Sequence, residues 1–528
     1  MISSVIGLAK CQSKDNPQKQ TKQRGRECRQ QVRRCFAVCF IIGYNSSVSK
    51  TIFKYPGVQD MKMLLLVSLL LCLPALALAQ GRTRGGRKAS APAKQPRKIF
   101  PYNYTIDDLP NGLRLVTVPT DYPNLVALYI VVSTGSRNEI EAGKSGYAHL
   151  FEHLMFRGSQ NYSPEQRDAI LKKAGASSNA YTTDDRTVFH EIFSKEDLDA
   201  VLKLEADRFQ HLQYPEANYK TETRAVLGEY NKNSADPTEK LFEVLRETAF
   251  KTHTYAHTTM GYIRDIEDMP NQYQYSLEFY KRYYRPEYTT ITIVGDVTRA
   301  RALALVKQYF GDWQRGSYVP NIPQEPAQDA PREAHVDWAN PTLPYVVVAF
   351  RAPAYSDENK DKIALDLLSS IAFGENSDLY QRLVIKEQKV DSLNAGAEDH
   401  KDQELFAAFA RVKDEKDMAY VEQQILDTFK RYTTELVSQQ DLDNTRSRFR
   451  YGFAQGMNSS EAIAGTLASY IALRRTPETL NKVFALADTV TPADIRDAAR
   501  RYFTDNNRTI VTLTHKAGDT TAQKEGER

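Results

Sequence analysis

Cysteine is almost absent from this 528-residue chain, and its five cysteines all lie before residue 73. The chain beyond residue 79 therefore has neither a disulfide framework nor a cysteine nucleophile. Glycine and proline, at 25 and 23 residues, are too sparse for a fibrous protein, and 41% hydrophobic residues is too many for a disordered one. What remains is a globular protein whose length favours two or three domains over one core.

The chain also has no long apolar run. The best candidate, residues 64–79, has sixteen residues, whereas a membrane span needs roughly twenty. It follows a short positive start at Met61 and ends in small residues at Ala77 and Ala79, which is typical of a secretory signal peptide. We predict that residues 61–79 are such a signal and that the protein is exported, to the periplasm or the exterior. A buried helix or an uncleaved anchor is the alternative.

Residues 1–60 hold eleven Lys and Arg against three acids, a balance of +8. Because a signal peptide stands at the start of a protein, we expect Met61 or Met63, rather than Met1, to be the initiator. Residues 1–60 are then an over-extended gene model. The alternative, a basic organellar presequence, leaves the signal-like segment unexplained.

The chain has almost no excess of one charge sign, because 70 Lys and Arg residues stand against 66 Asp and Glu residues, a net charge of +4. Removing residues 1–79 leaves −5, and residues 80–98 are a basic, flexible arm with seven basic residues and no acids. The chain from residue 99 onward has a net charge of −12. The basic excess belongs to the leader and the arm, so we expect no nucleic-acid partner and no stable membrane anchor after signal cleavage.

Four prolines within residues 316–332 mark a linker, because such a stretch cannot continue a helix or a central strand. It separates residues 99–315 from residues 333–515, and residues 516–528 read as a disordered tail. The two halves end in one shared pattern, a helix end, a turn and a β-branched strand: residues 281–294 and 500–513. We predict an α+β fold of two homologous domains, each a β-sheet flanked by helices, which form a clam-shell chamber. Chance similarity of short segments is the alternative.

The sequence His149-Leu-Phe-Glu152-His153 has the spacing His-x-x-Glu-His. On a helix these positions share one face, so the three side chains can converge. Two imidazoles four residues apart suit a zinc ion, and the carboxylate between them can take a proton from zinc-bound water. This order is the inverted zinc-protease motif. Two histidines on an ordinary helix are the alternative.

A catalytic zinc ion takes a third protein ligand and keeps one position open. Glu222 and Glu229 lie seven residues apart on a helical pattern, two turns along one face. One could bind the metal while the other hydrogen-bonds a ligand histidine. Two glutamates on a charged helix are usually solvated, and their spacing alone does not single them out.

With these motifs the sequence resembles the pitrilysin/insulinase family of zinc metallopeptidases, and in particular its bacterial processing-peptidase-like members. In that family the third ligand is a glutamate about 75 residues after the second histidine, and another functional glutamate precedes it by seven. The resemblance therefore assigns Glu229, 76 positions after His153, as the third ligand, and Glu222 as the second functional glutamate.

A further shared motif is Ser-Ser-Asn-Ala-x-Thr, present here at residues 177–182. The resemblance makes it an active-site edge strand whose backbone pairs with an extended substrate, and assigns substrate contacts to Asn179, Ala180 and Thr182. The alternative is a simple turn into the strand at residues 187–193.

The second half lacks what the first half has. Opposite the three motif residues stand Leu365, Leu368 and Ser369, so we expect no second metal site. Active family members also supply an Arg and a Tyr, seven residues apart, that bind and polarise the scissile peptide. Neither matches here, where the corresponding positions are Asp378 and Asp391 or Ser392. Nothing in the sequence favours Tyr380 or Arg382 as a replacement.

We predict a metalloendopeptidase with one Zn²⁺ per chain, which cleaves unfolded peptides or short protein segments through a zinc-activated water. His149, His153 and Glu229 hold the ion, Glu152 acts as general base and then acid, and Glu222 orients the site. The alternatives are a zinc-bearing subunit that needs a partner to supply the missing pair, and a non-catalytic structural subunit. A homodimer or a heterodimer with a related subunit is compatible with the sequence, and so is a chain that is active alone.

Overall fold

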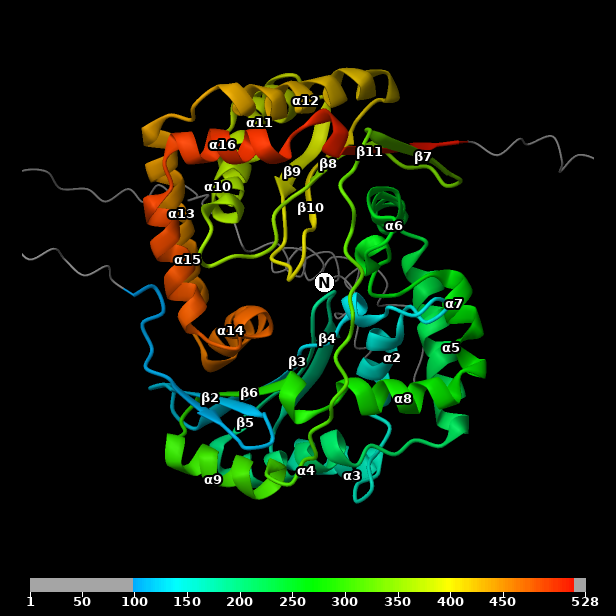
Figure 1. Ribbon diagram of the computed structural model, residues 1–528, viewed down its shortest axis with the longest axis vertical. Helices are drawn as coiled ribbons and strands as arrows, with labels where there is room; N and C mark the ends of the chain where they lie inside the picture. Colours follow the sequence, from blue (N-terminus) through cyan, green and yellow to red (C-terminus); the bar gives the residue numbers. More distant parts are fainter. Residues whose placement is uncertain (1–97, 517–528) are drawn as a thin grey trace, which may run out of the picture. The chain divides into compact units, whose positions relative to one another are not determined.

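The computed structural model describes residues 98–516 (Figure 1). The predicted leader, the signal peptide, the basic arm up to residue 97 and the tail from residue 517 lie outside the described residues. In the described part, no helix combines the length and the apolar character that a membrane crossing requires.

The first half is built on a six-stranded sheet in the order β1-β2-β6-β3-β5-β4. Only the β2–β6 pair is parallel. The strands are β1 (Thr105–Asp108), β2 (Arg114–Pro119), β3 (Leu125–Val132), β4 (Ser177–Thr182), β5 (Thr187–Ser194) and β6 (Thr289–Gly295). This order leaves β4, which carries the predicted substrate motif, at one edge of the sheet.

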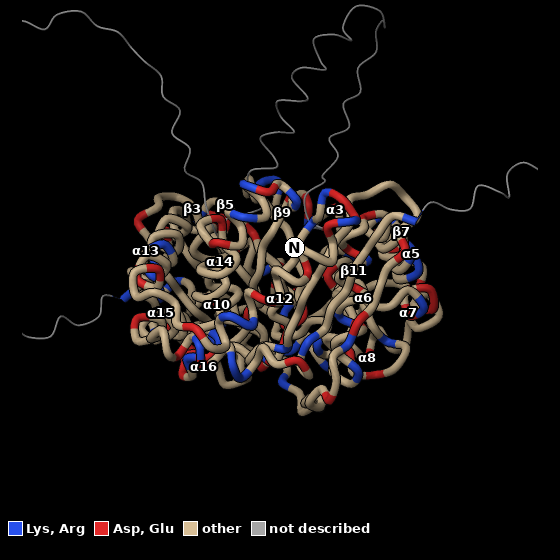
Figure 2. The backbone as a smooth tube through the Cα atoms, turned by 90° about the horizontal axis from the view of Figure 1, so that it is seen from above, with Lys and Arg blue, Asp and Glu red and all other residues tan. Residues whose placement is uncertain are grey.

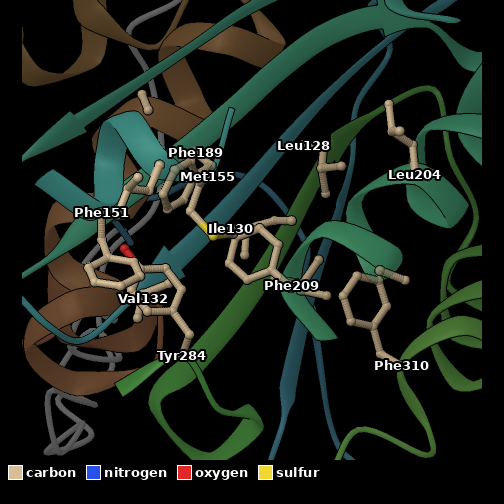
Figure 3. Close-up of a cluster of buried hydrophobic side chains, with 14 of the residues drawn as sticks. Leu128, Ile130, Val132, Phe151, Met155, Phe189, Leu204, Phe209, Tyr284 and Phe310 are labelled. Carbon is tan, nitrogen blue, oxygen red and sulfur yellow. The ribbon is translucent and has the colours of Figure 1, made fainter. Parts of the chain in front are cut away.

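Helices of the first half surround this sheet. They are α2 (Tyr147–Leu154), α3 (Pro164–Lys173), α4 (Leu198–Gln210), α5 (Glu216–Asn233), α6 (Pro237–Ala249), α7 (Ile263–Asp268), α8 (Tyr273–Tyr283) and α9 (Arg299–Phe310), with a short 3₁₀ turn η1 (Ser136–Asn138). Alternate residues of β3, Leu128, Ile130 and Val132, point into their core (Figure 3). There they lie in one buried cluster with the aromatic rings of Phe151 from α2 and Phe209 from α4.

The second half repeats this plan with five strands, in the order β7-β11-β8-β10-β9. They are β7 (Arg332–Trp338), β8 (Tyr345–Arg351), β9 (Val390–Gly396), β10 (Leu405–Val412) and β11 (Arg508–His515). Its helices are α10 (Lys360–Phe373), α11 (Asp378–Tyr380), α12 (Met418–Thr434), α13 (Gln439–Gly456), α14 (Ser460–Arg474), α15 (Glu478–Thr489) and α16 (Pro492–Tyr502), with a π-helical turn at Gln381–Lys386.

The two sheets share one topology, because β7, β11, β8, β10 and β9 repeat the order of β2, β6, β3, β5 and β4. The one parallel pair, β7–β11, takes the place of β2–β6. The predicted fold class, two α+β halves with helices packed on each sheet, is confirmed. The clam-shell chamber between the halves stays a prediction. Residues 311–331 between them, which include most of the predicted linker, form neither helix nor strand.

Each half also covers the sheet of the other. From the second half, α14 packs on β3 and β6, and its Leu467 shares a buried cluster with Tyr129 and Val131 on the other face of β3. From the first half, α6 packs on β7 and β11, and its Leu241 shares a cluster with Val347. Both central strands are therefore buried on two faces, which explains their nearly continuous apolar sequences. The halves meet through shared apolar cores.

Acidic and basic residues are interspersed along the described chain (Figure 2). Many form exposed pairs such as Lys195–Asp296, whose Nζ and Oδ2 atoms are 2.7 Å apart. Such surface pairs add little to stability, because water and salt screen the attraction. The buried clusters, not these pairs, dominate the stability of the fold.

Candidate metal centre

Helix α2 presents the His-x-x-Glu-His motif, and its N-terminus is held by a carboxylate. Glu139 accepts hydrogen bonds at 2.7 Å from the backbone N–H groups of Gly146 and Ala148, two groups that have no partner within the helix. Behind the motif, Phe151 and Met155 are fully buried in the first core (Figure 3). This anchoring fixes the direction in which the motif side chains point.

The position just before helix α2 requires glycine. Gly146 has φ of +88°, and a Cβ there would lie 2.6 Å from the carbonyl oxygen of Met260. We expect Gly146→Ala to lower the free energy of unfolding by at least about 2 kcal/mol, the sum of backbone strain and a forced shift of α2. Urea denaturation measures this. Gly143→Ala is the matched control, because Gly143 also has positive φ (+76°) but no atom within 4 Å of the added Cβ. Equal losses in both variants would contradict the packing argument.

His149 and His153 from α2 meet Glu229 from α5. All three offer ligand atoms within 4.8 Å of one another, and they are the one group of three such side chains among residues 98–516. Glu229 Oε2 lies 3.8 Å from His149 Nε2 and 3.6 Å from His153 Nε2. These distances are too long for hydrogen bonds. They suit ligands of one ion, because two atoms each about 2 Å from a metal lie at most about 4 Å apart. Two imidazoles and a carboxylate are also a donor set that zinc accepts.

The two histidines differ in their electrostatic surroundings. Burial and the neighbouring His153 lower the pKa of His149 to about 4, so its imidazole is neutral, the form that binds metals. Burial also disfavours charge on His153, but Glu222 and Glu229 outweigh it and raise the pKa of His153 to about 9.

Glu152 lies between the two histidines on the same helix face, and β4 holds its carboxyl group. Thr182 Oγ1 donates a 2.7 Å hydrogen bond to Glu152 Oε2. Burial raises the pKa of Glu152, although Thr182 and His153 act in the opposite direction. A partly buried carboxyl group beside the ligand cluster is well placed to accept and return a proton.

Glu222 lies outside the ligand group and contacts one of its members. Its Oε2 is 3.5 Å from His153 Nδ1, on the side of the ring opposite Glu229. Its Oε1 is held by Arg157 Nε at 2.8 Å. Glu222 is only 2% exposed, so a buried carboxyl group lies beside Nδ1 of His153, where a residue that orients a metal-binding histidine is usually found.

Models of one protein family match both halves of the chain. Residues 114–262 match the model described as insulinase (peptidase family M16), and residues 272–449 match the model described as peptidase M16 inactive domain. The chain belongs to the M16 family.

Individual M16 relatives align with most of the chain. Zinc protease PqqE of Helicobacter pylori is 28% identical over 418 residues, which are 77% of this chain and 91% of that protein. A probable mitochondrial-processing peptidase subunit beta of Arabidopsis thaliana is 23% identical over 77% of this chain and 78% of its own length. The crystal structure of a protease from Helicobacter pylori matches with a TM-score of 0.73 at 27% identity, over 78% of this chain and all of that chain.

The periplasmic protease PqqL of Escherichia coli matches with a TM-score of 0.64 at 19% identity. The match covers 81% of this chain but only 48% of PqqL. In fold, this M16 chain therefore corresponds to about half of PqqL.

The predicted substrate strand β4 is an edge strand, bonded to β5 on one side and to no other described strand. Thr182, at its end, reaches the site through its hydrogen bond to Glu152. Ala180 is buried, and Asn179 is exposed with its side-chain oxygen accepting a hydrogen bond from the Ala180 N–H. Their contact with substrate stays a prediction.

The second half of this M16 chain sends no polar contact to the metal centre. Among the described residues, no hydrogen bond or ion pair joins residues 333–515 to His149, His153, Glu229 or Glu152. Leu365 and Leu368 lie in the second core. Arg382 lines a cavity of about 550 Å³ formed by residues of the second half alone, and Asp378 in that cavity pairs with Arg431.

Two other residues of the second half stand where a motif residue is missing, and each bonds to a neighbouring strand of that half. Asp391 forms an ion pair with Arg411 on the neighbouring strand, and Ser369 Oγ donates a 2.6 Å hydrogen bond to the Ala395 carbonyl. Tyr380 packs against the second core. Among the described residues, the contacts given above for Arg382 and Tyr380 lie within the second half.

Sequence reasoning missed three supports of the site. Arg157 had a usable signal, since it lies four residues after His153 and so near the same helix face. Glu139, which caps α2, and the bond from Thr182 to Glu152 had none, because loops and a sheet edge bring them to the helix. They depend on tertiary packing.

Proposed function

We propose that this protein is a zinc-dependent endopeptidase that hydrolyses peptide bonds in unfolded peptides or short protein segments. The observation that carries the proposal is the convergence of His149, His153 and Glu229 beside the carboxyl group of Glu152. The names of relatives such as zinc protease PqqE support it. Export rests on residues 61–79, which lie outside the described residues, and belongs to the proposal.

The three ligands would hold one Zn²⁺, which when bound lowers the pKa of water and polarises a carbonyl oxygen. Glu152 takes the proton of the attacking water and passes it to the leaving amine. Thr182 holds the Glu152 carboxyl through one hydrogen bond, and Glu222 holds the His153 ring. The free edge of β4 offers backbone N–H and C=O groups to an extended peptide.

A second subunit, a copy of this chain or a related one, completes the site and encloses the substrate in our proposal. The halves of this chain share apolar cores, and opening them would expose that surface at about 25 cal/mol per Å². No polar group of the second half reaches the ligands, and the chain corresponds to half of PqqL. Relatives are named as subunits, among them cytochrome b-c1 complex subunit 1 of Rattus norvegicus. A purely structural role is disfavoured by the complete ligand set.

Removal of metal tests the proposal directly. We expect a chelator to abolish cleavage of a quenched fluorescent peptide by the purified chain, and stoichiometric Zn²⁺ to restore it. Zinc-loaded protein that gains activity only on addition of a related subunit would establish the heterodimer. Cleavage that survives complete removal of zinc would contradict the mechanism.

A further inference from the structure

The turn that follows β4 carries two buried aspartates. This turn, residues 183–186, is called here the β4–β5 turn, and it is closed by the hydrogen bond from the Thr183 N–H to the Arg186 carbonyl at 2.8 Å. Asp184 and Asp185 at its centre are 5% and 1% exposed. Two buried carboxylates in one turn require partners, since an unpaired buried charge is costly.

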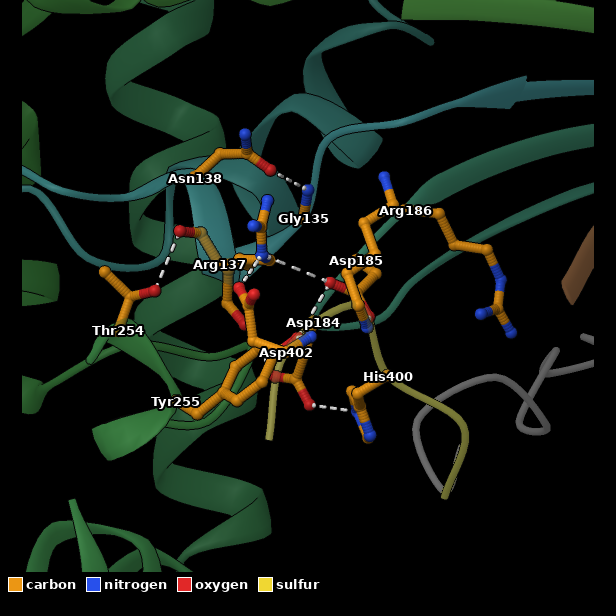
Figure 4. Close-up of polar contacts among 12 residues, drawn as sticks. Gly135, Arg137, Asn138, Asp184, Asp185, Arg186, Thr254, Tyr255, His400 and Asp402 are labelled. Carbon is orange, nitrogen blue, oxygen red and sulfur yellow. Dashed lines mark hydrogen bonds and ion pairs between the residues drawn. The ribbon is translucent and has the colours of Figure 1, made fainter. Parts of the chain in front are cut away.

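Asp184 finds its partners in both halves of the chain (Figure 4). Its Oδ2 accepts hydrogen bonds from Arg246 on α6 at 2.8 Å and from His400 Nε2 at 3.0 Å. Its Oδ1 accepts from Ser136 Oγ at 2.7 Å and from Arg246 at 3.0 Å. His400 belongs to the β9–β10 loop, residues 397–404, of the second half.

Asp185 is bound in the same way. Its Oδ1 accepts a 2.9 Å hydrogen bond from the Tyr255 hydroxyl, and its Oδ2 accepts one at 2.9 Å from the backbone N–H of Lys401 in the β9–β10 loop. Asp402 in that loop pairs with Arg137 at 2.5 Å (Figure 4). One short loop of the second half therefore contacts both aspartates and the segment beneath them.

The β9–β10 loop is itself fixed to the second half. The carbonyl oxygens of His400 and Glu404 accept hydrogen bonds from the N–H groups of Tyr355 and Ala352, at 2.8 and 2.6 Å. These backbone bonds give the loop a defined position relative to the end of β8.

On its other side the β4–β5 turn leads to the metal centre. It begins one residue after Thr182, the residue that hydrogen-bonds Glu152. Beneath it, the Arg137 N–H donates to the Asp184 carbonyl at 2.9 Å, and a Cβ on Gly135 would lie 2.1 Å from the Thr183 carbonyl oxygen. Because there is so little space under the turn, the turn cannot move without moving Thr182, the residue that precedes it.

We propose that His400 and Asp184 are positioning residues for Glu152: the β9–β10 loop holds the β4–β5 turn, and the turn holds Thr182 against the Glu152 carboxyl. The second half thus acts on the metal centre without touching it. This inference rests on the proposed function for its catalytic consequence, and on the described contacts alone for its structural one.

The charges around His400 set the pH range over which its contact with Asp184 stabilises the β4–β5 turn. His400 faces the acids Asp184, Asp185 and Glu404, the cations Arg246 and Lys401, and the ring of Tyr255. Burial opposes its charge, but Asp184 outweighs burial and raises the pKa of His400 to about 9. Because the folded pKa lies above the unfolded value near 6.5, the stabilisation is complete below that value and is lost as pH rises through about 9.

The contact between His400 and Asp184 also persists as the pH falls. Burial opposes the charge of Asp184, yet Arg246 and His400 keep the pKa of this carboxyl well below its usual range. We expect the stability conferred by the contact to be lost at low pH only below the ordinary aspartate value.

The test compares His400→Ala, His400→Gln and Tyr104→Phe in the complete chain, with the partner subunit if activity requires one. Tyr104 Oη donates a 2.9 Å hydrogen bond to Glu478, so Tyr104→Phe also removes a hydrogen bond between the halves, but one that lies away from β4.

We expect His400→Ala to lower kcat about tenfold with KM changed less than twofold, since small displacements of a catalytic group reduce kcat. Zinc affinity should not change. His400→Gln, which keeps a donor for Asp184, should recover most of the activity, and Tyr104→Phe should match the unchanged protein.

Amide hydrogen exchange of residues 177–186 tests the structural link without any activity. Exchange should be faster in His400→Ala than in Tyr104→Phe, and equal exchange in both overturns the proposal. In a Thr182→Val background, His400→Ala should cause no further fall in kcat, and an additive fall overturns it. If the unchanged protein shows no chelator-sensitive cleavage, the proposed function fails, and the exchange comparison alone then decides whether the loop holds β4.

Discussion

Replacing Glu152 with glutamine is expected to lower kcat by about 1000-fold while the protein keeps its zinc. A general base that also returns the proton contributes about 10²–10⁴-fold, and glutamine removes that function without changing the size of the side chain. The amide oxygen can still accept the hydrogen bond from Thr182, which holds Glu152 at 2.7 Å. The three ligands are untouched, so metal binding should persist.

Steady-state cleavage of a quenched peptide and the zinc content after dialysis measure these two effects together. Glu267→Gln is the control, because it removes the same charge from an exposed position on α7. Wild-type cleavage by Glu152→Gln would remove Glu152 from the mechanism. Loss of zinc in this variant would instead make Glu152 a ligand.

The second large effect concerns zinc affinity and separates the two glutamates of α5. We expect Glu229→Gln to weaken zinc binding about 100- to 1000-fold, because four-ligand zinc sites bind with about 10–16 kcal/mol, shared among their ligands. Glu222→Gln should weaken it by only about 10- to 100-fold, the usual cost of losing a residue that orients a ligand. The reason is geometric: Glu229 Oε2 faces the Nε2 atoms of both histidines, whereas Glu222 faces only Nδ1 of His153.

Competition with a chromogenic chelator measures both affinities. Glu216→Gln is the control on the same helix, since Glu216 is exposed and, within residues 98–516, forms an ion pair only with Lys220. If Glu229→Gln bound zinc as tightly as Glu216→Gln, Glu229 would not be a ligand. A larger loss in Glu222→Gln than in Glu229→Gln would exchange their roles.

Local spacing in the sequence was enough for α2 and for the fold class. Residues three and four apart on a helix share a face whatever surrounds them, so His149, Glu152 and His153 had to be neighbours once the helix formed. The apolar run of residues 125–132 agrees with a strand that the structure buries on both faces. In the second half, Leu365 and Leu368 show from their side chains alone that no second ligand set exists at that helix.

Tertiary structure decided everything that depends on contacts between distant segments. The sequence did not distinguish Glu222 from Glu229 without the family resemblance, because both lie on one face of α5 and only the packing of α5 against α2 sets their distances from His153. The bond from Thr182 to Glu152 and the hold of His400 on Asp184 span 30 and 216 residues. Periodicity determines neighbours within a few helix turns or along one strand; the rest follows from which faces the two apolar cores bring together.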